Sequence, residues 1–327
     1  MNIFRSLKEK ISGKNMKIVF PEATDDRILS AVVRLKREEL LSPILLGDVE
    51  AIEAAAHEAG FNISGIEIID PENFEAFDEM VAQFLERRKG KSTEDQAREV
   101  LKQVNYFGTM LVYQGLADGL VSGAVFSTGD TVRPALQIIK TRPGMKLISG
   151  SFLMIRGNDR YIFADCAINL DPDAETLADI AIESAATAKL FDIEPKVAML
   201  SYSSKGSGAG EMVEKVRQAT QIAQEKAPEL TLDGELQFDA AFSPEVAEKK
   251  APDSEVAGHA NVFVFPDLEA GNIGYKIAQR LGGFEAIGPI LQGMAKPISD
   301  LSRGANSEDV YKTAIITASQ ALSMSEK

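Results

Sequence analysis

The stretch LVSGAVFSTGDTVRPALQIIKT, residues 120–141, decides the fold class. Its first part, LVSGAVF over 120–126, is an apolar run typical of a buried strand. Its last part, PALQIIKT over 134–141, has a helical pattern, with Pro134 well placed for the first turn of a helix. A buried strand that leads at once into a helix is the repeating unit of α/β proteins with parallel sheets.

The same alternation recurs on both sides of this stretch. Before it, MKIVF at 16–20 predicts a strand, and a helical pattern follows from about Asp25 to Arg37. After it, KLISGSFLMI and RYIFADCAI, joined by RGNDR, predict an antiparallel hairpin. Further strands are predicted at SPILLGD, IEIID, KVAMLSY and NVFVF, and further helices at STEDQAREVLKQV (capped by Ser92 or Thr93), GTMLVYQGLADG, ETLADIAIESAATAKLF, from Glu211, and at GNIGYKIAQRL. The sequence therefore predicts an α/β fold with mainly parallel sheets.

Length and composition narrow the function classes. A chain of 327 residues is expected to form two domains, and the pattern changes near residue 145. The formal net charge of −14 disfavours binding to nucleic acid or anionic membranes. No apolar run reaches the roughly 20 residues that span a bilayer, and the N-terminus lacks the apolar region of a signal peptide. Cys166 is the only cysteine, which fits a reducing cytoplasm.

Metal and nucleophile chemistry have little support in the sequence. His57 and His259 have no second histidine or cysteine at ligand spacing, so both are interpreted as solvated side chains and no metal is expected. Cys166 is interpreted as a small buried hydrophobe. KGKST at 89–93 resembles the end of a P-loop but follows a helical pattern. KGSGAG at 205–210 lies between a strand and a helix, and it either cradles an anion or forms a surface loop.

Two segments could hold an anion, the first of them at the edge of a sheet. In the first, Ser127, Thr128, Thr131 and Arg133 cluster after a buried strand, where ligands bind in open α/β sheets. Their hydroxyls, the helix N–H groups and the guanidinium suit phosphate or carboxylate. The structural alternative is that Thr131 caps the helix and Arg133 lies on the surface.

The second segment is PISDLSRGANSEDVYKTAIITASQAL, residues 297–322. Ser307 is a credible N-cap for the final helix, and Asp309 in the first turn would complement its dipole. Ser302, Arg303 and Gly304 precede that cap, in a loop where no helix needs them. Ligand binding and plain capping are equally supported by these residues.

Four segments together resemble the phosphate acetyltransferase (phosphotransacetylase) family. They are TVRPALQIIKT (131–141), DGELQFDAAF (233–242), NVFVFPDLEAGNIGYKIAQRL (261–281) and GPILQGMAKPISDLSRGAN (288–306), the last followed by Asp309 and Val310. The resemblance runs from about Lys17 to the final helix and matches the short form without a regulatory domain. It implies two α/β/α sandwich domains with mainly parallel sheets and an active-site cleft between them. The last helix would return to the first domain, giving domains of 1–145 plus 298–327 and 146–297.

The resemblance also implies a reaction and the residues that carry it. The reaction is reversible transfer of acetyl between acetyl-CoA and phosphate, giving acetyl phosphate and CoA, by direct displacement in a ternary complex without a cofactor. Matched position by position, the residues are Ser302, Arg303, Asp309, Arg133 and Arg87, with Arg88 as an alternative to Arg87. The arginines would clamp phosphate, Ser302 would hydrogen-bond the thiol sulfur or the oxyanion, and Asp309 would take the thiol proton.

Proton transfer from the thiol to Asp309 is uphill by roughly 6 kcal/mol at reference pKa values. Closure that desolvates Asp309, or stabilisation of the thiolate by nearby groups, would have to offset this difference. Asn272, Gly274 and Lys276 are further candidates for substrate contacts. The resemblance also implies a cytoplasmic homodimer that is metabolically coupled to an acetate kinase.

Three alternatives stay open from the sequence. A butyryl or other acyl phosphate transferase of the same fold would use the same clamp with a different acyl pocket. An oxidoreductase of the decarboxylating-dehydrogenase kind would need an acidic metal cluster and a nucleotide site, and no convincing set of either is visible. A non-catalytic protein that binds acyl phosphate or CoA would bind ligand without turnover.

Overall fold

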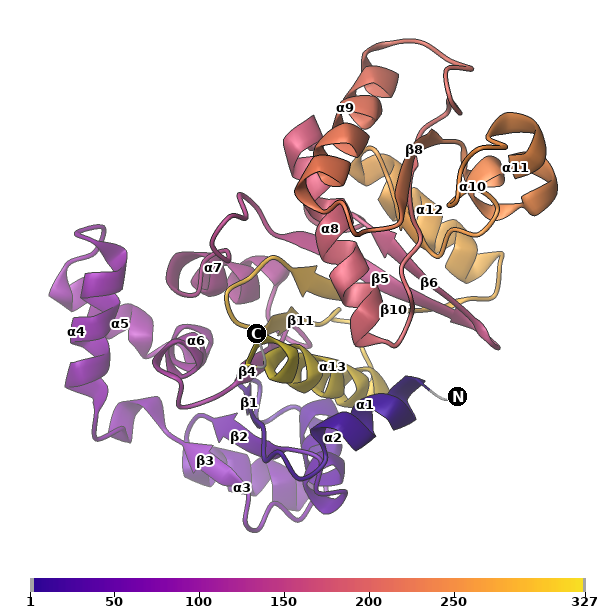
Figure 1. The fold of residues 1–327 in the computed structure, drawn as a ribbon. Helices are drawn as coiled ribbons and strands as arrows, with labels where there is room; N and C mark the ends of the chain where they lie inside the picture. Colours follow the sequence, from indigo (N-terminus) through magenta and orange to yellow (C-terminus); the bar gives the residue numbers. More distant parts are fainter. Residues whose placement is uncertain (1–2, 326–327) are drawn as a thin grey trace. The chain divides into compact units, whose positions relative to one another are not determined.

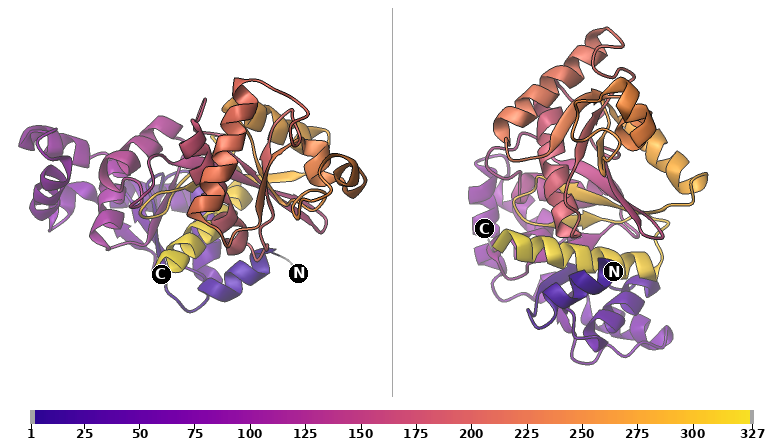
Figure 2. Two further views of the ribbon diagram at one scale, coloured as in Figure 1. Left: turned by 45° about the horizontal axis from the view of Figure 1, so that its top comes forward. Right: turned by 45° about the vertical axis from the view of Figure 1, so that its right-hand side comes forward.

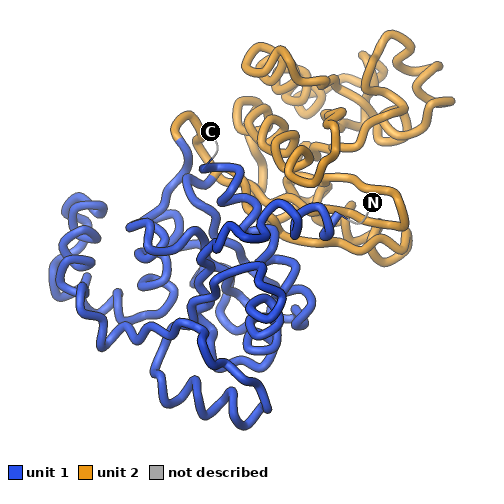
Figure 3. Tube along the Cα trace, turned by 60° about the horizontal axis from the view of Figure 1, so that its bottom comes forward, with its two compact units in different colours: residues 1–142, 294–327 blue, residues 143–293 orange. Residues whose placement is uncertain are grey.

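The chain divides into two compact units in a computed structural model that describes residues 3–325 (Figures 1 and 3). The first unit comprises residues 1–142 and 294–327, and the second comprises residues 143–293. The second unit is therefore an insertion into the first. The predicted domain limits at 145 and 298 fall three and four residues after those at 142 and 294. Residues 1–2 and 326–327 of the predicted first domain lie outside the described residues.

The first unit is built on a five-stranded sheet in the order β11-β4-β1-β2-β3, in which every neighbouring pair is parallel. Its strands are β1 (Lys17–Phe20), β2 (Ser42–Leu46), β3 (Glu67–Ile69), β4 (Gly119–Ser122) and β11 (Ile298–Asp300). β1, β4 and β11 are short and almost wholly buried, as expected for strands covered on both faces. Because all strands are parallel, their carboxyl ends meet at one edge of the sheet.

Helices cover both faces of this sheet. A Cβ added to Gly119 in β4 would lie 2.7 Å from Cγ2 of Thr317 in α13, and one added to Gly108 in α6 would lie 2.8 Å from Cδ1 of Leu120. Since Gly119 and Leu120 are consecutive residues of one strand, α13 and α6 lie on opposite faces. The helices of this unit are α1 (Ile3–Ile11), α2 (Asp26–Arg37), α3 (Val49–Glu58), α4 (Phe77–Arg88), α5 (Glu94–Leu101), α6 (Val104–Gln114), α7 (Thr128–Ile138) and α13 (Ser307–Ser325), with a 3-10 turn at Pro71–Asn73. Helix α13 packs along α1 and α2, so the first and last helices of the chain lie side by side (Figure 2).

The second unit has a six-stranded sheet in the order β10-β5-β6-β9-β7-β8. The predicted hairpin β5–β6 and the β10–β5 pair are antiparallel, and the other pairs are parallel. The strands are β5 (Ser149–Arg156), β6 (Asp159–Ala164), β7 (Val197–Leu200), β8 (Leu232–Leu236), β9 (Val262–Val264) and β10 (Glu285–Gln292); the helices are α8 (Ala174–Leu190), α9 (Glu211–Lys226), α10 (Phe238–Phe242), α11 (Pro244–Lys250) and α12 (Leu268–Arg280). Helices α8 and α9 lie on one face and α10 to α12 on the other (Figures 1 and 2). The fold-class prediction of an α/β protein with mainly parallel sheets is thereby confirmed.

Several predicted boundaries are wrong, most clearly around β4 and α7. The strand ends at Ser122, not at 126, and α7 begins at Thr128, so that Pro134 lies inside the helix. A proline at this position leaves the carbonyl of Asp130 without its helical N–H partner. The side chain of Asn105 in α6 donates to that carbonyl at 3.2 Å, which makes the proline tolerable. A partner from another helix cannot be recognised from local sequence.

The segment before the final helix contains two strands that the sequence did not predict. GPILQ is the end of β10, and Ile298–Asp300 form β11 at the edge of the first sheet. Helix α12 begins at Leu268 behind an Asp267 cap, three residues before the predicted start at GNIGYK. Gly288 and Pro289 interrupt the pattern of β10, and β11 has only three residues, so neither strand could be predicted from pattern.

Candidate active site

Three segments of the first unit meet where β1, β4 and β11 end. They are residues 21–25 before α2, residues 123–127 before α7, and residues 301–306 before α13. In open parallel sheets, ligands bind at the carboxyl ends of the strands. All the candidate residues of the two predicted anion-binding segments lie in or directly after two of these three loops.

The loop after β4 is wrapped around one buried carboxylate. Glu22, which is 5% exposed, accepts the backbone N–H groups of residues 123–126 at 3.1, 3.0, 2.8 and 2.7 Å. Four donors to one carboxylate fix both the loop and the charge. The apolar run that was predicted to continue the strand therefore forms a turn instead.

Helix α7 is capped by Ser127, not by Thr131. The Ser127 hydroxyl accepts the Asp130 N–H while the Asp130 carboxylate accepts the Ser127 N–H, which forms a reciprocal capping box. This contact with Ser127 is also the main reason that the pKa of Asp130 is lowered. Thr131 is buried at 1% exposure, and its hydroxyl oxygen has no hydrogen-bond partner among the described residues.

A second buried carboxyl, Asp300, lies at the end of β11. Burial raises its pKa to about 6, although the nearby hydroxyls of Thr128 and Thr131 oppose the rise. Oδ1 of Asp300 has no partner in hydrogen-bond geometry within residues 3–325. A Cβ added to Gly123 would lie 2.6 Å from this oxygen, so the glycine is needed for the close approach. The site thus contains one carboxyl that changes its charge near pH 6.

The loop after β11 exposes Ser302, Arg303 and Gly304 to solvent. Helix α13 is capped by Asn306, so the prediction of Ser307 as the cap is wrong. The Asn306 side chain accepts the Asp309 N–H at 3.0 Å, and the Asp309 carboxylate accepts the Asn306 N–H at 2.9 Å. Asp309 therefore has a structural role, and its second carboxylate oxygen forms no hydrogen bond with the described residues.

The candidate arginines differ in what already engages them. The guanidinium groups of Arg303 and Arg133 form no hydrogen bond or salt bridge to any residue within 3–325, so their donors face solvent. Arg87 instead donates to the carbonyls of Ile138 and Ile139 at 2.6 and 2.9 Å, at the end of α7. Arg133 and Arg303 are consequently the better placed to take up an anion, while Arg87 supports the helix that carries Arg133.

The sequence matches the family described as phosphate acetyl/butaryl transferase over residues 2–318. The chain belongs to this family. A phosphate acetyltransferase of Bacillus subtilis is 64% identical over 321 residues, covering 98% of this chain and 99% of that one. One of Staphylococcus aureus is 58% identical over 325 residues, covering 98% and 99%. A solved phosphotransacetylase structure from Streptococcus pyogenes superimposes with a TM-score of 0.97 at 61% identity, covering 98% of both chains.

In this member of the phosphate acetyl/butaryl transferase family, the remaining candidates lie on α12 of the second unit. Asn272 donates to the Cys166 carbonyl at 3.0 Å and accepts from Lys276, an exposed pair. A Cβ on Gly274 would lie 3.0 Å from the Phe265 ring, so this glycine allows the helix to pack on the sheet. Because α12 starts at Leu268, these residues lie well inside the helix, away from its N-terminal N–H groups.

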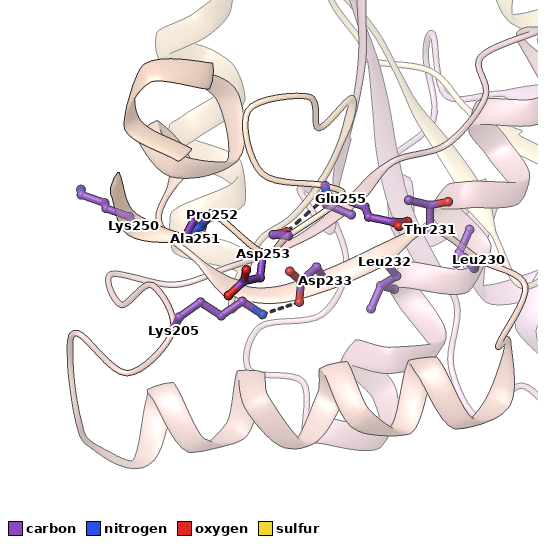
Figure 4. A pocket seen from close by; sticks show the side chains of 12 residues that line it. Lys205, Leu230, Thr231, Leu232, Asp233, Lys250, Ala251, Pro252, Asp253 and Glu255 are labelled. Carbon is purple, nitrogen blue, oxygen red and sulfur yellow. Dashed lines mark hydrogen bonds and ion pairs between the residues drawn. The ribbon is translucent and has the colours of Figure 1, made fainter. Parts of the chain in front are cut away.

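The glycine-rich loop at 205–210 uses much of its polar backbone internally. The Gly206 N–H donates to the buried Glu235 carboxylate at 2.8 Å, and the Gly208 N–H donates to the Ser203 hydroxyl at 2.8 Å. A pocket of about 550 Å³ opens beside it, where the Lys205 ammonium reaches Asp233 (Figure 4). The lysine charge in that pocket is therefore already neutralised. None of the predicted site residues lines this pocket.

Sequence reasoning did not identify three polar residues that lie at the ends of the strands and support the loops of the site. Glu22, Arg27 and Asp300 all lie at or shortly after the carboxyl end of a parallel strand. That position was a usable signal, since polar residues there face the ligand edge. The burial of Glu22 and Asp300 could not be predicted from the sequence. How deeply each carboxyl is buried, and which groups it contacts, depends on the neighbouring strands.

The described residues offer no support for metal or thiol chemistry. Between residues 3 and 325 no group of His, Cys, Asp and Glu side chains could hold a metal ion. Nor does any helix in that range have the length and apolar character to cross a membrane. Burial raises the pKa of the Cys166 thiol well above its usual value, in agreement with its interpretation as a buried hydrophobe. His57 and His259 are both exposed, as expected.

Proposed function

We propose that this chain is a phosphate acetyltransferase, which transfers acetyl reversibly between acetyl-CoA and inorganic phosphate. The observation that carries the proposal is the Ser302–Arg303 pair, exposed at the ligand edge of a parallel sheet with the Arg303 guanidinium unengaged by residues 3–325. Membership of the family supports the reaction type, and relatives at 58–64% identity named phosphate acetyltransferase support acetyl as the acyl group.

The chemistry is a direct displacement. In the direction of acetyl-CoA synthesis, the CoA sulfur attacks the carbonyl carbon of acetyl phosphate, the C–S bond forms, and the C–O bond to phosphate breaks. Phosphate leaves with that electron pair, and the proton that Asp309 takes from the thiol passes to the phosphate. Arg303 and Arg133 bind the phosphoryl oxygens, and Ser302 hydrogen-bonds the sulfur or the oxyanion. No acyl-enzyme is formed, and no cofactor is required beyond the CoA substrate.

Asp309 is the proposed base for the thiol proton. One of its oxygens holds the Asn306 N–H, which fixes the carboxylate at the start of α13. The other oxygen is available for the proton. Stabilisation of the thiolate by the arginines would lower the barrier to this proton transfer.

The substrate contacts extend from this centre. Ser127, Thr128 and Thr131 at the start of α7 are proposed to line the anion site, with Ser127 also capping the helix. Arg87 is proposed to assist through its hold on α7. Asn272, Gly274 and Lys276 remain proposed contacts from the second unit.

The enzyme is further proposed to be a cytoplasmic homodimer whose product, acetyl phosphate, suits an acetate kinase. CoA thioesters are intracellular metabolites, which supports the compartment. A row of exposed apolar side chains, made up of Ile273 and Ile277 on α12 and Leu281 at its C-cap, supports a contact with a second copy.

The decisive experiment measures release of free thiol from acetyl-CoA in a chelator-treated sample, with and without phosphate. Release that depends on phosphate and not on metal is expected. Arg303→Ala should lower kcat/KM for phosphate by on the order of a hundredfold, because a charge-assisted clamp is lost. Arg5→Ala serves as the control, because Arg5 is exposed and its ion pair within residues 3–325 is with Glu9. Faster turnover of butyryl-CoA would favour the other acyl transferases, and ligand binding without any turnover would favour a sensor.

A further inference from the structure

Arg27, on the first turn of α2, contacts all three loops of the candidate site. Its Nε and Nη2 donate to the two carboxylate oxygens of Asp25 at 2.9 and 2.8 Å. Nη2 also donates to the carbonyl of Ala124 at 2.8 Å. Nη1 donates to the carbonyls of Arg303 and Ala305, both at 2.9 Å. One side chain thus joins the segments that follow β1, β4 and β11.

These contacts use the whole hydrogen-bonding capacity of the guanidinium. An arginine has five N–H donors in a fixed planar fork, and each of the five contacts above can take one. The two hydrogen bonds to the Asp25 carboxylate fix the plane of the Arg27 guanidinium. The side-chain hydrogen bond with Arg27 is also the main cause of the lowered pKa of Asp25. Arg27 therefore has no donor left for a phosphate, in contrast to Arg303 and Arg133.

The contact lies next to the residues of the proposed reaction. The Arg303 carbonyl follows the Ser302 peptide directly, so a shift of that carbonyl moves both side chains. Glu22 fixes the backbone of 123–126 from the same β1–α2 segment. The two reactive loops are thus set relative to each other through the segment of residues 22–27.

We propose that Arg27 is a positioning residue for the transfer reaction. It holds the backbone of Ser302 and Arg303 in register with the start of α7 and touches no substrate itself. The proposal rests on the proposed function, because it assigns Arg27 to the same site. Arg303 is exposed, so without Arg27 water can take its place at the Arg303 carbonyl, and the fold survives while the loop geometry loosens. Misplacement of reacting groups by about 1 Å can cost on the order of a hundredfold in rate.

Two substitutions separate geometry from charge. Arg27→Gln removes the fork and the charge, whereas Arg27→Lys keeps the charge on one nitrogen that cannot reach the Ala124, Arg303 and Ala305 carbonyls together. We expect both to lower kcat by about tenfold to a hundredfold, with the KM values for phosphate and acetyl-CoA changed by less than about threefold. The control is Arg34→Gln, since Arg34 is also on α2 and binds Glu308 and the Tyr311 ring on α13, but not the loop.

Hydrogen exchange of residues 301–306 gives a readout that does not need activity. The Ala305 N–H donates to the Ser302 carbonyl at 2.8 Å, so its exchange reports whether the loop is held. It should become faster in both Arg27 variants and stay unchanged in Arg34→Gln. Full kcat in Arg27→Lys, or a raised phosphate KM at normal kcat, would overturn the proposal in favour of a charge or substrate-contact role. Absence of thiol release in the unmodified enzyme would remove the proposed function and the catalytic role, whereas exchange would still decide whether Arg27 holds the loop.

Discussion

At the scale of single residues, Asp309 combines a helix cap with a proposed base, and one substitution separates them. Asp309→Asn keeps an oxygen that can accept the Asn306 N–H, but it cannot take a proton. We expect kcat for CoA and acetyl phosphate to fall by about a hundredfold or more, with the melting temperature nearly unchanged. Asp309→Ala, which loses both roles, should lower both quantities. Normal turnover in Asp309→Asn would end the base role and leave only the cap.

Asp300 gives the protein a stability term that depends on pH. Its folded pKa of about 6 lies above its ordinary 3.8, so the native state binds this proton more tightly than the unfolded state. The contribution is therefore fully present below about pH 4 and is lost as the pH rises through 6. The difference between the folded and the ordinary pKa of Asp300 corresponds to about 3 kcal/mol in the free energy of unfolding.

The matching experiment compares Asp300→Asn with the unmodified enzyme. The free energy of unfolding of the variant, relative to the unmodified enzyme, should rise by up to about 3 kcal/mol between pH 4 and pH 7. Urea unfolding followed by circular dichroism at each pH measures it. Comparing differences cancels the constant effect of the amide. A difference that does not vary over this range would show that Asp300 does not titrate there.

At the scale of elements, α12 combines close packing on one side with an exposed apolar row on the other. Ile273 and Ile277 on the helix and Leu281 at its C-cap are 57, 53 and 85% exposed and follow each other at intervals of four residues, which places them on one side. If this face meets a second copy, Ile277→Asp should convert a dimer into a monomer in sedimentation equilibrium, because it buries an unpaired charge. Leu116→Asp, at an isolated residue that is 49% exposed, should leave the dimer intact. A dimer that survives Ile277→Asp would place the contact elsewhere.

At the scale of the whole molecule, the two units differ in whether they are formed by one continuous segment of the chain or by two. Residues 143–293 are contiguous and contain a complete apolar core, which includes Phe152, Phe163 and Phe263. Residues 1–142 lack β11 and α13, which complete their sheet and cover one face. Thr141 and Met294 form an isolated bridge, so the chain leaves and re-enters the first unit at one place.

Fragments test this dependence. Residues 143–293 alone should unfold in one cooperative thermal transition, whereas residues 1–142 alone should show none, because β4 loses β11 and α1 loses α13. Joining 1–142 to 294–327 through a short glycine linker should restore a transition. Circular dichroism measures all three chains. Cooperative unfolding of 1–142 alone would mean that α13 is dispensable for the first unit.

The sequence by itself determined the α/β class, the hairpin β5–β6 and most helix positions, because the apolar periodicities of strands and helices are local. It also placed Arg133 on a segment that follows a strand, since order along the chain predicts the ligand edge of a parallel sheet. Ser302 and Arg303 were predicted in a loop before the final helix and Asp309 in its first turn, without the strand β11 that precedes them. Family resemblance added their proposed roles.

Only the tertiary structure decided which polar residues support these segments. Asn105 makes a mid-helix Pro134 acceptable, Glu22 turns an apolar run into a loop, and Arg27 joins loops from three strands. The residues in these contacts lie 25, 104 and 276 positions apart, in elements that meet only when the sheet has formed. The burial that raises the pKa of Asp300 likewise arises from neighbouring elements and not from local pattern, and so do the contacts of Arg27 with the carbonyls of Ala124, Arg303 and Ala305.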